Sequence, residues 1–365
     1  MPCIVADDLT EEQIRAFRLA DNKVGEIAEW DFDLLDEELS DIFDIEMDLF
    51  GFDLNLDDEA EEEGDPTEWL NEKSEKLTDS FIIPPMTVFD TRQGYWQDRK
   101  RAWKDIGLKS DDGREEALLG DGMKVIADKL GAGHTGTSIF DPVLCEIAYK
   151  WFNVTGGKIY DCFAGGSVRG IVASKLGYDY TGIDLRQEQI DANYRNAAEL
   201  GVDVKWHCDD SLNADKYVED NSVDMIFSCP PYADLEVYSD DERDISNMDY
   251  EQFKVVYKQI IDIACRKLKE DRFAVFVVGD VRDKKGFYRN FVDYTKQCFN
   301  ENGLHTYNDI VLLEQISTAA LRCGKIFNAG RKVTKVHQNV LVFYKGDPKN
   351  IKANYTAISV DDISA

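Results

Sequence analysis

The 365-residue sequence lacks the features that would place it in a membrane or in an oxidising compartment. No apolar run approaches the roughly 18 residues of a membrane-spanning helix, and no basic-then-apolar signal pattern opens the chain. The eight cysteines form no CxxC pair and no His/Cys ligand spacing, which disfavours a disulfide framework and a metal site. No internal repeat is visible. We therefore expect a cytoplasmic protein with reduced thiols, no membrane segment and no metal.

Positive charge is scarce in only one part of the chain. Residues 1–80 contain 28 acidic and 5 basic residues, whereas residues 81–365 contain 44 acidic and 37 basic residues. The net charge of −30 is thus concentrated at one end. A mixed domain beside an acidic segment remains compatible with a nucleic-acid partner.

The composition predicts four segments. Residues 1–52 form short acidic helices, 53–80 an acidic linker, 81–348 the main domain and 349–365 a tail. From residue 157 onward, β-like runs alternate with helical runs, as in a sheet with helices on both faces. The seven predicted strands lie at 158–164, 178–185, 203–210, 222–230, 272–280, 305–315 and 338–346. The last two have no long helix between them, which predicts an antiparallel hairpin at one edge of a mostly parallel sheet.

A glycine-rich turn, DCFAGGSVRG at 161–170, follows the first of these strands. Gly165 and Gly166 let the backbone turn sharply and approach a ligand, but Ser167 breaks the dinucleotide pattern GxGxxG and argues against NAD. Asp184 ends the second strand, where a carboxylate can hold ribose hydroxyls. Asp209 and Asp210 end the third strand, where they can meet an adenine amino group. These strand ends together predict an adenosine-shaped site.

The fourth strand ends in Cys229-Pro230-Pro231-Tyr232, beside that site. Here the sequence resembles the amino-group DNA methyltransferases, whose reactive motif is Asp/Asn/Ser-Pro-Pro-Tyr/Phe and whose cofactor motif is similar to 161–166. The segment 138–152 resembles the helical motif that lines the methionine end of their cofactor. The resemblance covers roughly residues 81–346.

This resemblance implies a Rossmann-like α/β methyltransferase that uses S-adenosylmethionine and acts on DNA. The residues that it implies for the cofactor are Asp141, Pro142, Asp161, Phe163, Ala164, Gly165, Gly166, Asp184, Leu185 and Asp210. Those that it implies for catalysis are Ser228, Cys229, Pro230, Pro231 and Tyr232.

The chemistry explains these residue types. An exocyclic amine of adenine or cytosine is a poor nucleophile, and a rigid loop of carbonyl acceptors without competing N–H donors would polarise it. Tyr232 can stack on a base that has left the duplex. Cys229 departs from the family because a thiol is a weak acceptor, so Ser228 or a main-chain carbonyl is the alternative acceptor. The target is left open between cytosine N4 and adenine N6.

Two basic segments are candidates for DNA contact. Residues 315–346 contain no acid, and within them we select Arg322, Lys325, Arg331, Lys332 and Lys335. Residues 90–104 interleave basic and aromatic side chains, and there we select Arg99 and Arg101. The second segment is equally typical of a helix that docks on the core. A homodimer is one option for the assembly.

The N-terminal segment resembles the last portion of a ParB-like domain, as found ahead of phage and prophage methyltransferases. The part of such a domain that would precede it is absent from this chain, so we assign the segment no activity. Two alternatives to a DNA methyltransferase stay open, namely an RNA methyltransferase and a catalytically inactive DNA-binding or partition accessory.

Overall fold

The computed structural model describes residues 83, 85–108, 140–232, 239, 241–314 and 319–356. The predicted N-terminal helices, their ParB-like resemblance and the acidic linker lie outside these described residues.

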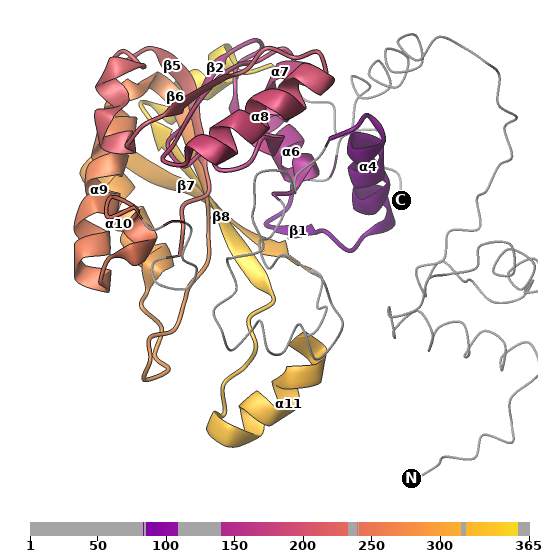
Figure 1. Cartoon of the computed structure of the whole chain (residues 1–365), viewed down its shortest axis with the longest axis vertical. Coiled ribbons are helices and arrows are strands. Elements are labelled where there is room, and N and C mark those ends of the chain that lie inside the picture. Colours follow the sequence, from indigo (N-terminus) through magenta and orange to yellow (C-terminus); the bar gives the residue numbers. More distant parts are fainter. Residues whose placement is uncertain are drawn as a thin grey trace, which may run out of the picture. The chain divides into compact units, whose positions relative to one another are not determined.

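An eight-stranded sheet forms the centre of the described residues (Figure 1). Its strands, in spatial order, are β1 (Val88–Asp90), β7 (Leu304–Leu313), β8 (His337–Lys345), β6 (Leu268–Val278), β5 (Val223–Ser228), β2 (Lys158–Asp161), β3 (Asp179–Asp184) and β4 (Lys205–Cys208). Neighbours pair in parallel except at β8, which is antiparallel to both β6 and β7. The expected α/β architecture with a mostly parallel sheet is therefore confirmed.

The predicted strand count of seven is wrong, because β1 adds an eighth strand. It pairs in parallel with β7, with Val88 opposite Val311. Three residues are too few for a periodic pattern to be visible. Consequently β7 is not an edge strand, and the antiparallel strand β8 lies inside the sheet rather than at its edge.

Helices cover both faces of the sheet. One face packs against α4 (Gly94–Asp105), α6 (Pro142–Phe152), α7 (Val168–Lys175) and α8 (Gln187–Glu199). The other packs against α9 (Tyr250–Lys267), α10 (Phe291–Glu301) and the 3-10 turn η3 (Ser211–Lys216). Shorter elements are η5 (Ile245–Asn247), η6 (Pro348–Asn350) and α12 (Ile351–Asn354).

A further helix, α11 (Ala319–Gly330), lies in the connection between β7 and β8. We predicted no long helix between these two strands, and this expectation is wrong. Gly324, Asn328 and Gly330 suggested a loop, but the residues around them are mostly compatible with a helix. In Figure 1, α11 lies beyond the end of β8, away from the helices that cover the sheet.

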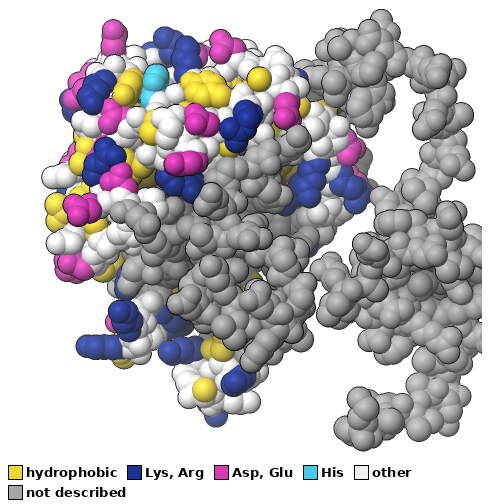
Figure 2. Space-filling view, viewed as in Figure 1, with side chains coloured by type: hydrophobic (Ala, Val, Ile, Leu, Met, Phe, Trp, Pro, Cys, Tyr) yellow, Lys and Arg dark blue, Asp and Glu magenta, His cyan; other side chains and the backbone are white. Residues whose placement is uncertain are grey.

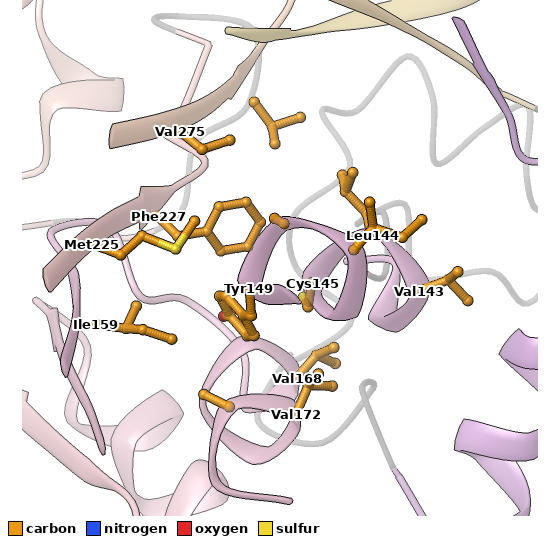
Figure 3. Packing of buried hydrophobic residues seen from close by; sticks show 14 of the residues in the cluster. Val143, Leu144, Cys145, Tyr149, Ile159, Val168, Val172, Met225, Phe227 and Val275 are labelled. Atoms are coloured by element: carbon orange, nitrogen blue, oxygen red, sulfur yellow. The ribbon is translucent and has the colours of Figure 1, made fainter. Parts of the chain in front are cut away.

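Buried side chains of α6 pack against the middle of the sheet (Figure 3). The rings of Tyr149 and Phe227 meet edge to face, with centroids 5.2 Å apart. Val168 and Val172 carry the packing onward to α7. This core fixes the ends of β2 and β5, two neighbouring strands from which the chain continues in opposite directions across the sheet. Such a switch point opens a crevice at the carboxyl ends of the strands.

Candidate active site

A cavity of about 390 Å³ lies at this switch point. Of the site residues predicted from sequence, it is lined by Asp141, Phe163, Gly165, Gly166, Asp184, Leu185, Asp210, Cys229, Pro230, Pro231 and Tyr232. The structure therefore brings both groups of predicted residues, those for the cofactor and those for catalysis, to one cavity. Four other predicted residues, Pro142, Asp161, Ala164 and Ser228, are buried beside it and do not line it.

Asp161, at the end of β2, anchors the glycine turn that follows it at residues 161–170. Its carboxylate accepts hydrogen bonds from Arg169 Nε at 2.6 Å, from the Tyr180 hydroxyl at 2.7 Å and from the Ser228 hydroxyl at 2.6 Å. The Arg169 guanidinium also donates to the carbonyl of Ala164, at 2.8 Å. Because this network is buried and satisfied, it rigidifies the turn.

Ser228 is consequently not placed to act on a substrate. Its side chain is fully buried, and its hydroxyl donates to Asp161 while accepting from the backbone N–H of Phe163. The alternative in which Ser228 replaces Cys229 as the acceptor has no support in this geometry. Cys229, which is half-buried, is the residue of the pair that lines the cavity.

Asp184 connects the end of β3 to the glycine turn. Its two oxygens accept from the backbone N–H groups of Gly165, at 2.9 Å, and Arg186, at 3.0 Å. Gly165 has φ of +51°, a left-handed conformation that favours glycine. Burial raises the pKa of Asp184 above its ordinary value. The carboxylate faces the cavity and has lone pairs left for further donors.

Asp209 and Asp210 lie on different sides of the end of β4. Asp210 lines the cavity and caps η3 by accepting from the N–H of Leu212 at 2.9 Å. Asp209 instead pairs with Lys216 at 2.8 Å and accepts from Tyr217. Of the two acids, only Asp210 is available to a ligand in the cavity.

Tyr232 is fixed by its hydroxyl. The hydroxyl donates to Gln338 Oε1 on β8 at 2.6 Å, and the ring meets Phe291 edge to face at 6.4 Å. Gln338 in turn donates to Glu314. Tyr232 is therefore an oriented wall of the cavity, held by the antiparallel strand that lies next to β6.

Helix α4 docks on the core through its aromatic residues. Trp96 and Trp103 are completely buried. Arg99 forms a two-pronged ion pair with the buried Glu146 of α6, at 2.7 and 2.9 Å. This pairing accounts for Arg99 without DNA, whereas Arg101 lies at the surface and pairs with Asp98.

The remaining predicted DNA contacts lie in or after α11. Lys325 and Arg331 are exposed, and Lys332 and Lys335 are half-buried. Arg322 belongs to α11, but its side chain lies outside the described residues.

Sequence reasoning missed several residues of the cavity. Lys100 lines it and pairs with Asp141 at 3.1 Å. Arg243, just before η5, and Gln338, on β8, line it as well. Lys100 stood in a segment that we read for DNA contact, and Gln338 opens a predicted strand, so neither carried a visible signal for this site.

The strand order, with the antiparallel β8 between β6 and β7, defines a Rossmann-like methyltransferase fold. Residues 223–363 match the family model of the DNA methylases. This match supports methyl transfer with S-adenosylmethionine as the methyl donor. None of the curated proteins matches the chain.

Several solved structures resemble the chain. TrmN from Thermus thermophilus is 14% identical with a TM-score of 0.40, covering 56% of this chain and 49% of its own. A TehB-like SAM-dependent methyltransferase from Corynebacterium glutamicum is 19% identical with a TM-score of 0.35, covering 62% and 97%. A second Thermus thermophilus protein, assigned as a DNA modification methylase, is 17% identical with a TM-score of 0.29, covering 42% and 54%. The chain thus spans about half the length of TrmN, and its fold assignment rests on its own strand order rather than on these scores.

None of the helices in the described part of the chain is both long and apolar enough to span a bilayer. Within the same residues, no three His, Cys, Asp or Glu side chains gather as a metal site would require.

Proposed function

We propose that the chain transfers a methyl group from S-adenosylmethionine to an exocyclic amino group of a base in DNA, either cytosine N4 or adenine N6. One observation carries this proposal. A single cavity is lined by the glycine turn, by the strand-end carboxylates and by Cys229-Pro230-Pro231-Tyr232. A donor and an acceptor base can therefore meet inside it.

The residues present fit the cofactor. A side chain at Gly165 would stand in otherwise open space, 3.9 Å from Arg169, so the glycine leaves room for close approach to the turn. Asp184 would accept from the ribose hydroxyls, and Asp210 would meet the adenine end. Lys100 would pair with the carboxylate of the methionine end, beside Asp141. When bound, S-adenosylmethionine supplies an electrophilic methyl group on a sulfonium.

The loop after β5 would position the attacking amine. Pro230 and Pro231 have no N–H to compete for it, so the main-chain carbonyls of this loop are the acceptors that polarise it. The rigid loop and the hydrogen-bonded Tyr232 hold the base in one orientation, which lowers the entropic part of the barrier. To reach the cavity, the base must leave the duplex, and the Tyr232 ring would offset part of the unstacking cost.

Cys229 leaves the target base undecided. In the resembling family, Asp at this position leans to adenine N6 and Ser to cytosine N4, and a thiol corresponds to neither. Since Ser228 is occupied by Asp161, the acceptor role falls to main-chain carbonyls with Cys229 as a small neighbour. The chemistry at the amine is then independent of the Cys229 side chain.

The test incubates the full chain with methyl-labelled S-adenosylmethionine and either duplex DNA or RNA, then identifies the modified nucleoside by mass spectrometry. We expect N4-methylcytosine or N6-methyladenine in DNA. Label only in RNA would assign the chain to RNA. Cofactor binding without label in either nucleic acid would contradict the proposal and favour an inactive accessory protein.

A further inference from the structure

A short hairpin follows β6 at the side of the cavity where Tyr232 lies. A side chain added at Gly279, the residue after β6, would come within 3.8 Å of the Tyr232 ring. The chain therefore leaves the sheet in contact with the catalytic loop. It then turns back through residues 281–289 before α10 begins.

This hairpin is rigidly built. Backbone hydrogen bonds link Asp283 N–H to the Phe287 carbonyl at 2.8 Å and Arg289 N–H to the Val281 carbonyl at 2.9 Å. Arg282 donates to the carbonyl of Gly286 at 2.8 Å, and its guanidinium lies 3.8 Å from the centre of the Tyr288 ring. The side chains at the tip are therefore displayed by an ordered frame.

The tip displays aromatic and cationic side chains to solvent. Phe287 is 71% exposed, the largest exposed fraction among the large hydrophobic residues that the structure describes, and Tyr288 is 38% exposed. Lys284 and Lys285 are exposed beside them. Within the described residues neither lysine forms an ion pair with a carboxylate. Exposed rings beside exposed lysines are typical of nucleic-acid binding.

The hairpin is joined to the basic segment around α11. A side chain at Gly286 would overlap the end of Lys332, only 2.6 Å from its Cε, so these two segments touch. On α11 and just after it, Ile326, Phe327 and Val333 are 37%, 43% and 66% exposed. We call residues 281–289 and 323–336 together the basic surface.

The basic surface carries a net positive charge, whereas the chain as a whole is negatively charged. The surface contains eight Lys and Arg residues and one Asp, in a chain of net charge −30. Figure 2 shows Lys and Arg side chains gathered over the hairpin and α11 at the lower end of the view. A surface of this charge favours an anionic partner, and its hairpin follows directly on the end of β6 that contacts Tyr232.

We propose that the basic surface binds the phosphates of duplex DNA that flank the target, and that Phe287 inserts into the base stack beside the extruded base. This inference rests on the proposed function. The lysines would supply salt-sensitive affinity. The exposed ring would occupy the gap that the departing base leaves, as apolar wedges do in bent DNA.

The test measures the anisotropy of a fluorescein-labelled, mixed-sequence duplex with the full chain over a series of KCl concentrations. Lys284→Gln together with Lys285→Gln should weaken binding about tenfold and lower the slope of log affinity against log salt by nearly 2, because each phosphate contact contributes about 0.9. The matched control is Lys349→Gln with Lys352→Gln. These lysines are also exposed. They follow the last residue of β8, whereas α11 precedes its first, and the length of the strand separates the two ends by about 30 Å. The control should leave the slope unchanged.

Phe287→Ala should weaken duplex binding about fivefold or more without changing the salt slope, because stacking is not electrostatic. The loss of affinity caused by Phe287→Ala should be smaller on a duplex with one bulged base, because the base stack of that duplex is already open. Val255→Ala, an exposed apolar residue of α9, is the control. Thermal midpoints equal to the parent chain would show that all variants fold.

If the Lys284/Lys285 double variant keeps the salt slope of the parent chain, the assignment of the basic surface to DNA phosphates is wrong. The surface would then bind something else, such as the acidic residues 1–80. If Phe287→Ala weakens binding equally on the intact and the bulged duplex, Phe287 does not insert into the base stack. Methyl transfer does not enter these readouts. If the chain binds DNA with the expected salt slopes but transfers no methyl group, the role of the basic surface is supported and the proposed function is wrong.

Discussion

At the scale of single residues, the site depends on which side chains the strand ends direct into the cavity. Ser228 and Cys229 are neighbours in sequence, yet one is held by Asp161 and the other lines the cavity. Asp209 and Asp210 separate in the same way. The sequence placed each pair at the end of a strand, where the structure also has it. It could not assign the orientation, which depends on distant partners such as Asp161 and Lys216.

Tyr232 offers the sharpest test at this scale. Tyr232→Ala should abolish methyl transfer and change cofactor affinity little, because the ring is placed to contact the base. Tyr232→Phe keeps the ring and loses the bond to Gln338. We expect its kcat to fall by about tenfold or less, since one neutral hydrogen bond contributes roughly 0.5–1.5 kcal/mol.

Steady-state kinetics and cofactor titration of both Tyr232 variants distinguish the roles. If Tyr232→Phe is as damaging as Tyr232→Ala, the hydroxyl rather than the ring carries the function. Loss of cofactor binding in Tyr232→Ala would mean that the base pocket is misplaced.

At the scale of elements, long periodic segments were predicted well and short or glycine-containing ones were not. The strands β2, β3 and β5, and the alternation of strands with helices, were recognised from their patterns. The missed elements were β1, with three residues, and α11, whose glycines imitate a loop. The aromatic and basic pattern at 90–104 fitted two roles, and only the packing of Trp96 and Trp103 shows that α4 docks on the core.

The attachment of α4 to α6 predicts a large stability effect. Glu146 is fully buried and binds Arg99, the Trp103 indole at 2.8 Å and Lys150 at 2.6 Å. Glu146→Ala would leave these donors, including a mostly buried guanidinium, without their acceptor. We expect a loss of about 3–5 kcal/mol in the free energy of unfolding, measured by urea denaturation.

Lys205→Ala is the control for Glu146→Ala. Lys205 pairs with Asp179 at 3.0 Å, but both side chains are largely exposed, at 58% and 43%. Solvent screens such a pair, so the expected loss is below about 1 kcal/mol. Comparable losses in the two variants would show that α4 contributes little to the fold.

At the scale of the whole molecule, the cavity draws on residues from most of the described chain, from Thr91 to Gln338. Local motifs predict only part of this set, because the fold brings residues such as Lys100 and Gln338 to the cavity from elsewhere in the sequence. The same breadth means that a ligand in the cavity binds only the folded protein. Cofactor binding should therefore raise the stability of the whole domain rather than of one element.

A thermal shift experiment tests this linkage. At a S-adenosylmethionine concentration of about 100 Kd, the free energy of unfolding should rise by about 2.7 kcal/mol. For a domain of this size, that corresponds to a Tm increase of about 5–10 °C. Asp184→Asn should reduce the shift, because the ionised carboxylate that would accept from the ribose is lost.

The pH dependence of this shift identifies the group responsible. Burial raises the pKa of Asp184, so its carboxyl becomes protonated at a less acidic pH than an ordinary aspartate does. Protonation removes an acceptor, and the cofactor-induced shift should therefore decline as the pH falls through that raised pKa. Asp184→Asn has no proton to gain, so its smaller shift should not change over the same range. If the parent and the variant decline together, another group governs cofactor binding, and the placement of the ribose at the end of β3 is wrong.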